Sequence, residues 1–118
     1  MSTPHAHQPL SLQQQRCTHQ SGAALSPAEQ QILLSQLQGW GIDASVPGGV
    51  LFKTFKLPDF HRTMAFVNAV AWIAHEQDHH PDMAVSYNQC GIRWSTHSVN
   101  GLSINDFICA ARVDALSA

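Results

Sequence analysis

The stretch from Pro58 to Asp78 constrains the fold most, because it predicts one long helix whose end is set by a proline. Apolar side chains recur along it at helical spacing in two stripes. Pro81 cannot continue the helix, and it disfavours helical geometry at the residue before it. We therefore expect His79 and His80 at the helix exit, where side chains can face a cleft. The first stripe is Phe60, Met64, Val67, Ala71 and Ala74, and the second is Phe66, Val70 and Ile73.

Other helix and turn signals lie on both sides of this helix. Ser26-Pro27-Ala28-Glu29 is a capping box with proline at the first helical position, and it predicts a helix that ends at Gly39. A second capping pattern, Ser103-Ile104-Asn105-Asp106, begins the last helix. Both patterns predict short helices at the ends of the folded part.

Two strand pairs separate the helices. Residues 40–45 and 50–57 read as strands joined by the turn Pro47-Gly48-Gly49, and alternating residues 83–88 and 92–97 predict a second hairpin that turns between Asn88 and Gly91. The order helix, two strands, helix, two strands, helix predicts an α+β fold. We expect a two-layer sandwich, in which a four-stranded antiparallel sheet has its helices packed on one face.

The first 24 residues differ in composition from the rest. They are rich in Gln, Ser, His and Pro, and they contain few large apolar side chains. Such a segment buries too little surface to offset its ordering entropy. We therefore predict a disordered tail over residues 1–24 that is dispensable for folding, and a single domain over residues 25–118.

Charge and cysteine content exclude several classes of protein. Charged residues make up 12% of the chain and the net formal charge is -2, so no basic surface for nucleic acid is expected. No apolar run is long enough to span a bilayer, and no secretory signal is visible. The 3 scattered cysteines do not form a disulfide framework. The expected location is the cytoplasm.

Three histidines are expected to converge at one edge of the sheet. Pairing outward from a turn at Asn88 to Gly91 brings His97 opposite Asp82, next to the His79-His80-Pro81 corner. Imidazole titrates near neutral pH, so such a cluster suits proton transfer. The alternative is that each histidine is an ordinary surface residue. A register slip of one residue would turn His97 to the other face of the sheet.

The pattern His75-Glu76-x-x-His79 allows a different hypothesis, since it matches the zinc-protease motif. The longer form of that motif requires Gly and His where this chain has Asp82 and Val85. Pro81 also ends the helix directly after the pattern. A zinc hydrolase is therefore the less favoured alternative, and no metal ligands are predicted.

Several sequence blocks resemble the pterin-4a-carbinolamine dehydratase family over residues 25–118. The double histidine before Pro81 and the later Thr96-His97 pair are the most specific of them. One departure is His75, where the family commonly has Glu. The blocks are Leu37-Gln38-Gly39-Trp40, His79-His80-Pro81-Asp82, Tyr87, Ser95-Thr96-His97-Ser98, Gly101-Leu102-Ser103 and Asn105-Asp106-Phe107.

The resemblance implies a dehydratase that converts a 4a-hydroxytetrahydropterin into a quinonoid dihydropterin and water. It implies that His79 and His97 form an acid–base pair, and that His80 binds the substrate and assists. No metal or organic cofactor is needed, because imidazoles can move both protons. Asp106 also belongs to the family pattern, but its position at a helix start favours a structural cap. The substrate-binding residues implied are Asp78, Pro81, Thr96, Ser98 and Val99.

The expected partners follow from the helix stripes and from the resemblance. A small domain has one sheet to cover one apolar stripe, so the second stripe predicts a homodimer or homotetramer. The resemblance implies a small pterin as substrate and an aromatic amino acid hydroxylase as the enzyme whose cofactor is recycled. The alternative from a different class is a non-catalytic dimerisation or coactivator module.

Overall fold

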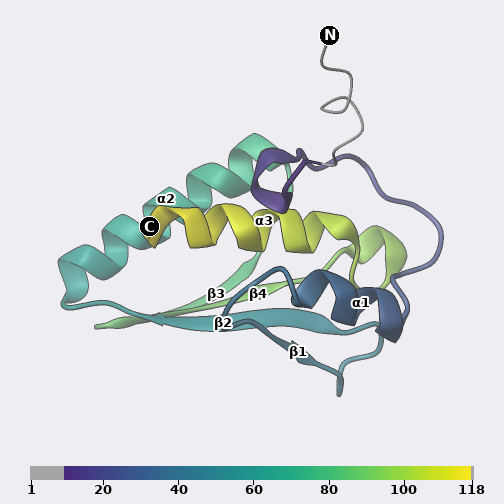
Figure 1. The fold of residues 1–118 in the computed structure, drawn as a ribbon. Helices are drawn as coiled ribbons and strands as arrows, with labels where there is room; N and C mark the ends of the chain where they lie inside the picture. Colours follow the sequence, from purple (N-terminus) through teal and green to yellow (C-terminus); the bar gives the residue numbers. More distant parts are fainter. Residues whose placement is uncertain (1–9, 118) are drawn as a thin grey trace, which may run out of the picture.

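Helices cover one face of a four-stranded antiparallel sheet in the computed structural model, which describes residues 10–117 (Figure 1). The strand order is β1-β2-β4-β3, so each hairpin supplies one central and one edge strand. The predicted α+β class and two-layer arrangement are confirmed. The strands are β1 (Gly41–Asp43), β2 (Val50–Lys56), β3 (Asp82–Ser86) and β4 (Gln89–Trp94).

The α-helices begin where the sequence supplies caps. The side chain of Ser26 accepts a hydrogen bond from Glu29 N, and Asp59 accepts one from Arg62 N at 2.7 Å. Ser103 and Asp106 form a complete capping box, as predicted. These bonds satisfy amide groups that have no partner inside a helix. The α-helices are α1 (Pro27–Leu34), α2 (Phe60–Gln77) and α3 (Ile104–Asp114), and the 3-10 turns are η2 (Leu12–Gln14), η3 (His97–Val99) and η4 (Ala115–Ser117).

The core lies between the sheet and helices α2 and α3. Trp94 and Leu51 project from the sheet with no exposed surface, and Phe107 meets them from α3, also fully buried. Val70 is the fully buried apolar residue of α2. Among the residues described, no helix is long and apolar enough to cross a membrane.

The second hairpin turns earlier than the sequence analysis predicted. Ser86 pairs with Gln89, so the turn is Tyr87-Asn88 rather than Asn88 to Gly91. Asp82 consequently lies opposite Arg93 and not opposite His97. The physical reason is burial. Cys90 is fully buried, so the side chains of β4 that face the core start at Cys90, and the strand must already be paired there. Only two residues then remain for the turn between the paired residues Ser86 and Gln89.

Residues 10–24 do not form the disordered tail that their composition predicted. Leu12 is 4% exposed and belongs to the core cluster. We call residues 15–20 the strap, because they run along α3 and past the C-terminal end of α2. Arg112 donates to the carbonyl of Gln15 at 2.6 Å, and Asn105 donates to the carbonyl of Thr18 at 2.7 Å. The composition of this segment did not indicate that it is ordered. Polar side chains of the domain donate hydrogen bonds to the backbone carbonyls of the strap, and these bonds order it although it has few apolar side chains. Residues 1–9 lie outside the described residues.

We expect Leu12→Ala to lower the free energy of unfolding by about 2 kcal/mol, the lower end for a buried leucine because this segment can detach locally. Leu10→Ala is the matched control, since Leu10 is 58% exposed. Urea denaturation of both variants is the measurement. Equal stability of the two variants would restore the disordered-tail prediction.

Candidate active site

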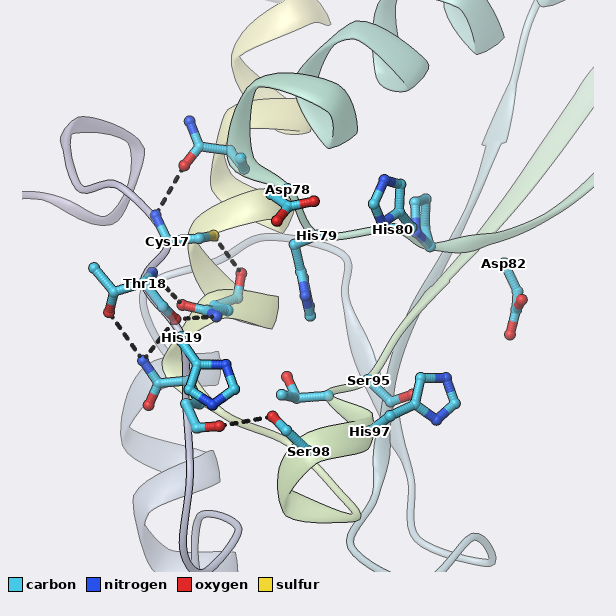
Figure 2. A pocket seen from close by; sticks show the side chains of 15 residues that line it. Cys17, Thr18, His19, Asp78, His79, His80, Asp82, Ser95, His97 and Ser98 are labelled. Carbon is cyan, nitrogen blue, oxygen red and sulfur yellow. Dashed lines mark hydrogen bonds between the residues drawn. The ribbon is translucent and has the colours of Figure 1, made fainter.

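A pocket of about 500 Å³ opens where the C-terminal end of α2, the residues after β4 and the strap meet (Figure 2). This volume is in the range of small-molecule sites. Val99 is the one predicted site residue that is not in its wall, and it is buried elsewhere. The predicted residues that line the pocket are Asp78, His79, His80, Pro81, Thr96, His97 and Ser98.

The exit of α2 directs His79 into the molecule. Asp78 adopts the left-handed conformation, with φ 50 and ψ 45, which ends the helix. The amide of His79 then donates back to the carbonyl of Ala74 at 3.1 Å. This is a common way to close a helix, and it reverses the chain within one residue. His79 becomes mostly buried while His80, the next residue, stays exposed.

His79 is held by a buried carboxylate. Its Nε2 lies 2.6 Å from Oδ1 of Asp106, whose side chain has no exposed surface. The other oxygen of Asp106 accepts from the Thr96 hydroxyl at 2.8 Å and from the Ser103 amide at 2.9 Å. Both of these donors occupy Oδ2, so Oδ1 is left to accept from His79, and we assign Nε2 as the donor. Nδ1 is then the nitrogen that can exchange a proton.

The surroundings of His79 favour its charged form. Burial alone would disfavour the imidazolium, but the hydrogen bond and the charge of Asp106 outweigh it, so the pKa of His79 is raised above its ordinary value. The ring also stacks on Trp94, with centroids 5.5 Å apart and planes 9° from parallel. This contact fixes the ring plane. His79 is thus a pre-oriented group with an enlarged protonated fraction near neutral pH.

Asp106 therefore has two roles where the sequence analysis expected one. It completes the capping box of α3 through Ser103, as predicted, and it also orients His79. A cap needs only one carboxylate oxygen, and the second oxygen remains available for a partner from the segment that follows α2. Nothing in the local pattern around Asp106 could indicate that partner, because His79 is distant in sequence.

His97 reaches the pocket through the loop after β4, and not through pairing with Asp82 as predicted. Thr96 pairs with Gly101 through an amide-to-carbonyl bond of 2.8 Å, which closes a short loop around η3. A side chain at Gly101 would meet the Cα of Gly48 at 2.7 Å, so only glycine allows this close approach. His97 is the first residue of η3, exposed on the pocket wall.

One wall of the pocket comes from the strap, which the sequence analysis did not include in the site. Cys17, Thr18, His19 and Gln20 line it. Figure 2 shows the first three of them across the pocket from His80 and Asp82. The Ser98 hydroxyl donates to the carbonyl of Gln20 at 2.7 Å and ties this wall to η3. The segment carries no motif, so only the fold could identify it. Other lining residues not predicted are Gln77, Asp82, Ser95 and Asn105.

The geometry does not support the zinc alternative. His75 is exposed and packs against the Trp72 ring at a centroid distance of 5.4 Å, whereas Nε2 of His79 is directed at Asp106. His75 is also not among the pocket residues. Within residues 10–117, no three His, Cys, Asp or Glu side chains are grouped so that they could hold a metal ion.

Comparisons with known proteins point to one family. The model of the family described as pterin 4 alpha carbinolamine dehydratase matches residues 23–116. A protein of Stenotrophomonas maltophilia (strain K279a), provisionally named pterin-4-alpha-carbinolamine dehydratase, is 49% identical over 110 residues, which are 92% of this chain and 93% of the relative.

Two solved structures resemble the fold. One is titled a transcriptional coactivator/pterin dehydratase from Brucella melitensis; it has a TM-score of 0.75 and 28% identity, over 80% of this chain and 99% of that one. The other is titled a pterin dehydratase-like protein identified as a RuBisCO assembly factor in the alpha-carboxysome. Its TM-score is 0.59 at 26% identity, over 69% of this chain and 92% of that one.

Proposed function

Because the chain belongs to the pterin 4 alpha carbinolamine dehydratase family, we propose that it dehydrates a 4a-hydroxytetrahydropterin to a quinonoid dihydropterin and water. The observation that carries this proposal is a pocket of about 500 Å³ that is lined by His79, His80 and His97. The ring of His79 is held there by buried Asp106. Elimination of water needs a proton donated to the leaving hydroxyl and a proton removed from a ring nitrogen. Two imidazoles on separate segments of the chain can do both.

The roles of the histidines follow from their surroundings. His79 has a raised pKa and is the general acid, because more of it is protonated near neutral pH. His97 is exposed, lines the same pocket and takes the ring-nitrogen proton as general base. His80 binds the substrate at the rim, together with Asp78, Pro81 and Ser98, which also line the pocket. The product is then reduced, which returns the cofactor of an aromatic amino acid hydroxylase.

Thr96 has a supporting role in this proposal. Its hydroxyl lies 2.7 Å from the Ser103 hydroxyl and donates to Asp106, and the residue is 5% exposed. These bonds occupy it within the protein. Thr96 therefore positions Asp106 instead of binding the pterin through its hydroxyl, and Val99 supports η3 from the interior.

A direct assay tests the proposal. The carbinolamine is generated in the cuvette by a pterin-dependent hydroxylase, and its decay is followed by ultraviolet absorbance with and without the purified protein. Acceleration that saturates with substrate supports a dehydratase. A decay rate equal to the uncatalysed one would leave the non-catalytic alternative. It is the second candidate because one related structure is titled a coactivator as well as a pterin dehydratase, and the other is titled a RuBisCO assembly factor.

We also propose that the protein is a homo-oligomer. Helix α2 buries Val70 and Ile73 against the core but leaves Phe60 50% and Trp72 60% exposed. Large apolar side chains on one helix are commonly covered by a second copy of the chain. We expect light scattering at micromolar concentration to give a dimer or tetramer mass. A mass near 12.9 kDa, that of one chain, would contradict this.

A further inference from the structure

Two cysteines meet directly behind the candidate active site. Sγ of Cys17, in the strap, lies 3.6 Å from Sγ of Cys109, on α3. The two residues are 92 positions apart in sequence. A disulfide needs its sulfur atoms about 2.0 Å apart, so side-chain rotations that bring the two atoms about 1.6 Å closer would reach bonding distance.

The two thiols differ in access. Cys17 is half-buried and lines the pocket, so a small oxidant can reach its sulfur through the pocket mouth. Cys109 is fully buried on α3, one helical turn after Asp106. The third cysteine, Cys90, is fully buried in β4. Access therefore favours Cys17 as the sulfur that reacts first.

The thiols also differ in acidity, in the direction that a stepwise oxidation needs. The hydrogen bond with Cys109 lowers the pKa of Cys17, with burial opposing it and the His79 charge assisting. The same contact and burial raise the pKa of Cys109. The thiolate is the reactive form, so Cys17, whose pKa is lowered, is the thiol of the pair that ionises more readily and reacts first.

We propose that Cys17 and Cys109 are a reversible oxidation site, at which a peroxide converts the two thiols into a disulfide that locks the strap onto α3. In the first step the Cys17 sulfur attacks one peroxide oxygen, the O–O bond breaks, and one water leaves. In the second step Cys109 attacks the sulfur of the resulting sulfenic acid and expels a second water. Two thiols and one hydrogen peroxide thus give one disulfide and two waters, and a reducing dithiol reverses the reaction by exchange.

The consequence concerns the pocket wall. In the dithiol form the strap is held by hydrogen bonds, such as that from the Cys17 amide to Gln77 at 2.8 Å. Strap and domain can separate when such bonds open together. The disulfide adds a covalent link between Cys17 and α3, directly before Thr18 and His19. The pocket wall that Thr18 and His19 form can then no longer move away from α3.

The experiment uses the full chain, titrated with hydrogen peroxide and analysed by peptide mapping without reduction, by thiol counting after denaturation and by thermal melting. We expect a Cys17–Cys109 linked peptide and the loss of two thiols per chain. Closing so long a loop should raise Tm by roughly 10 °C, and dithiothreitol should reverse the shift. This test does not depend on the dehydratase activity.

Two variants are the controls. Cys17→Ser, at a half-buried position that tolerates the change, should lose both the linked peptide and the Tm shift, whereas Cys90→Ala should keep both. Three outcomes would overturn the proposal. They are Cys17 oxidised to sulfinic acid with Cys109 still a free thiol, a linkage between two chains, and a linked peptide that leaves Tm unchanged.

Discussion

His79→Gln should lower the rate of carbinolamine dehydration by roughly 10²–10⁴-fold, the size of a general acid–base contribution. The amide of glutamine can still donate a hydrogen bond to Asp106, so the buried carboxylate keeps a partner and the fold is retained. It cannot exchange a proton at neutral pH. The measurement is kcat for carbinolamine decay, with a thermal melt to verify folding. Alanine is a poorer choice here, because it would leave Asp106 without its partner at 2.6 Å.

His75→Gln is the matched control for this variant. The same substitution one helical turn earlier changes an exposed residue outside the pocket, so activity should stay within about twofold of the unmodified protein. The pair of variants also separates the two motif interpretations. A zinc site built on His75-Glu76-x-x-His79 would lose activity in both variants alike. Near-normal turnover in His79→Gln would refute the acid–base assignment.

Asp106→Ala should be the most destabilising single change in the site, costing about 3–5 kcal/mol, the range for breaking a buried pair. It leaves Nε2 of His79, the Thr96 hydroxyl and the Ser103 amide without their shared acceptor. Chemical denaturation monitored by tryptophan fluorescence measures the loss. Asp82→Ala, at an exposed carboxylate on the same pocket, should stay within about 0.5 kcal/mol. A similar loss of unfolding free energy in the two variants would show that the buried hydrogen bonds of Asp106 contribute little to stability.

Asp106→Asn separates charge from packing at the same position. Because the Asp106 charge helps to raise the pKa of His79, its removal should shift the pH–rate limb that reports His79 to lower pH. A raised pKa in the folded state also means that protonation of His79 contributes stability. That contribution is fully present below pH 6.5 and is lost as the pH rises through the raised value. The stability difference between the unmodified protein and Asp106→Asn should therefore narrow at alkaline pH.

His97 lines the same pocket as His79 and His80, although the strand register from which this was predicted is wrong. The predicted turn put His97 opposite Asp82, but the observed partner of Asp82 is Arg93. His97 comes to the pocket through the loop that Thr96 and Gly101 close beyond the end of β4. Turn placement depends on which side chains are buried. The sequence analysis began the second strand at Ile92, whereas the inward-facing side chains of β4 begin at Cys90, which is fully buried.

The sequence by itself determined the elements and the groups available for chemistry. Helix starts at Ser26 and Ser103 and the stop before Pro81 follow from hydrogen bonding and backbone sterics within a few residues, and such local rules act in any context. The order of those elements then allowed few folds other than one sheet with helices on one face.

Only the tertiary structure decided what surrounds the reactive imidazole. The contact between His79 and Asp106 joins residues 27 positions apart, and that between Cys17 and Cys109 joins residues 92 apart. The strap is ordered by polar groups that other elements supply, including Asn105 and Arg112. Such contacts depend on how the helices pack on the sheet, so no local pattern encodes them. The pKa of His79 and the pocket wall at Cys17 are for this reason properties of the folded chain.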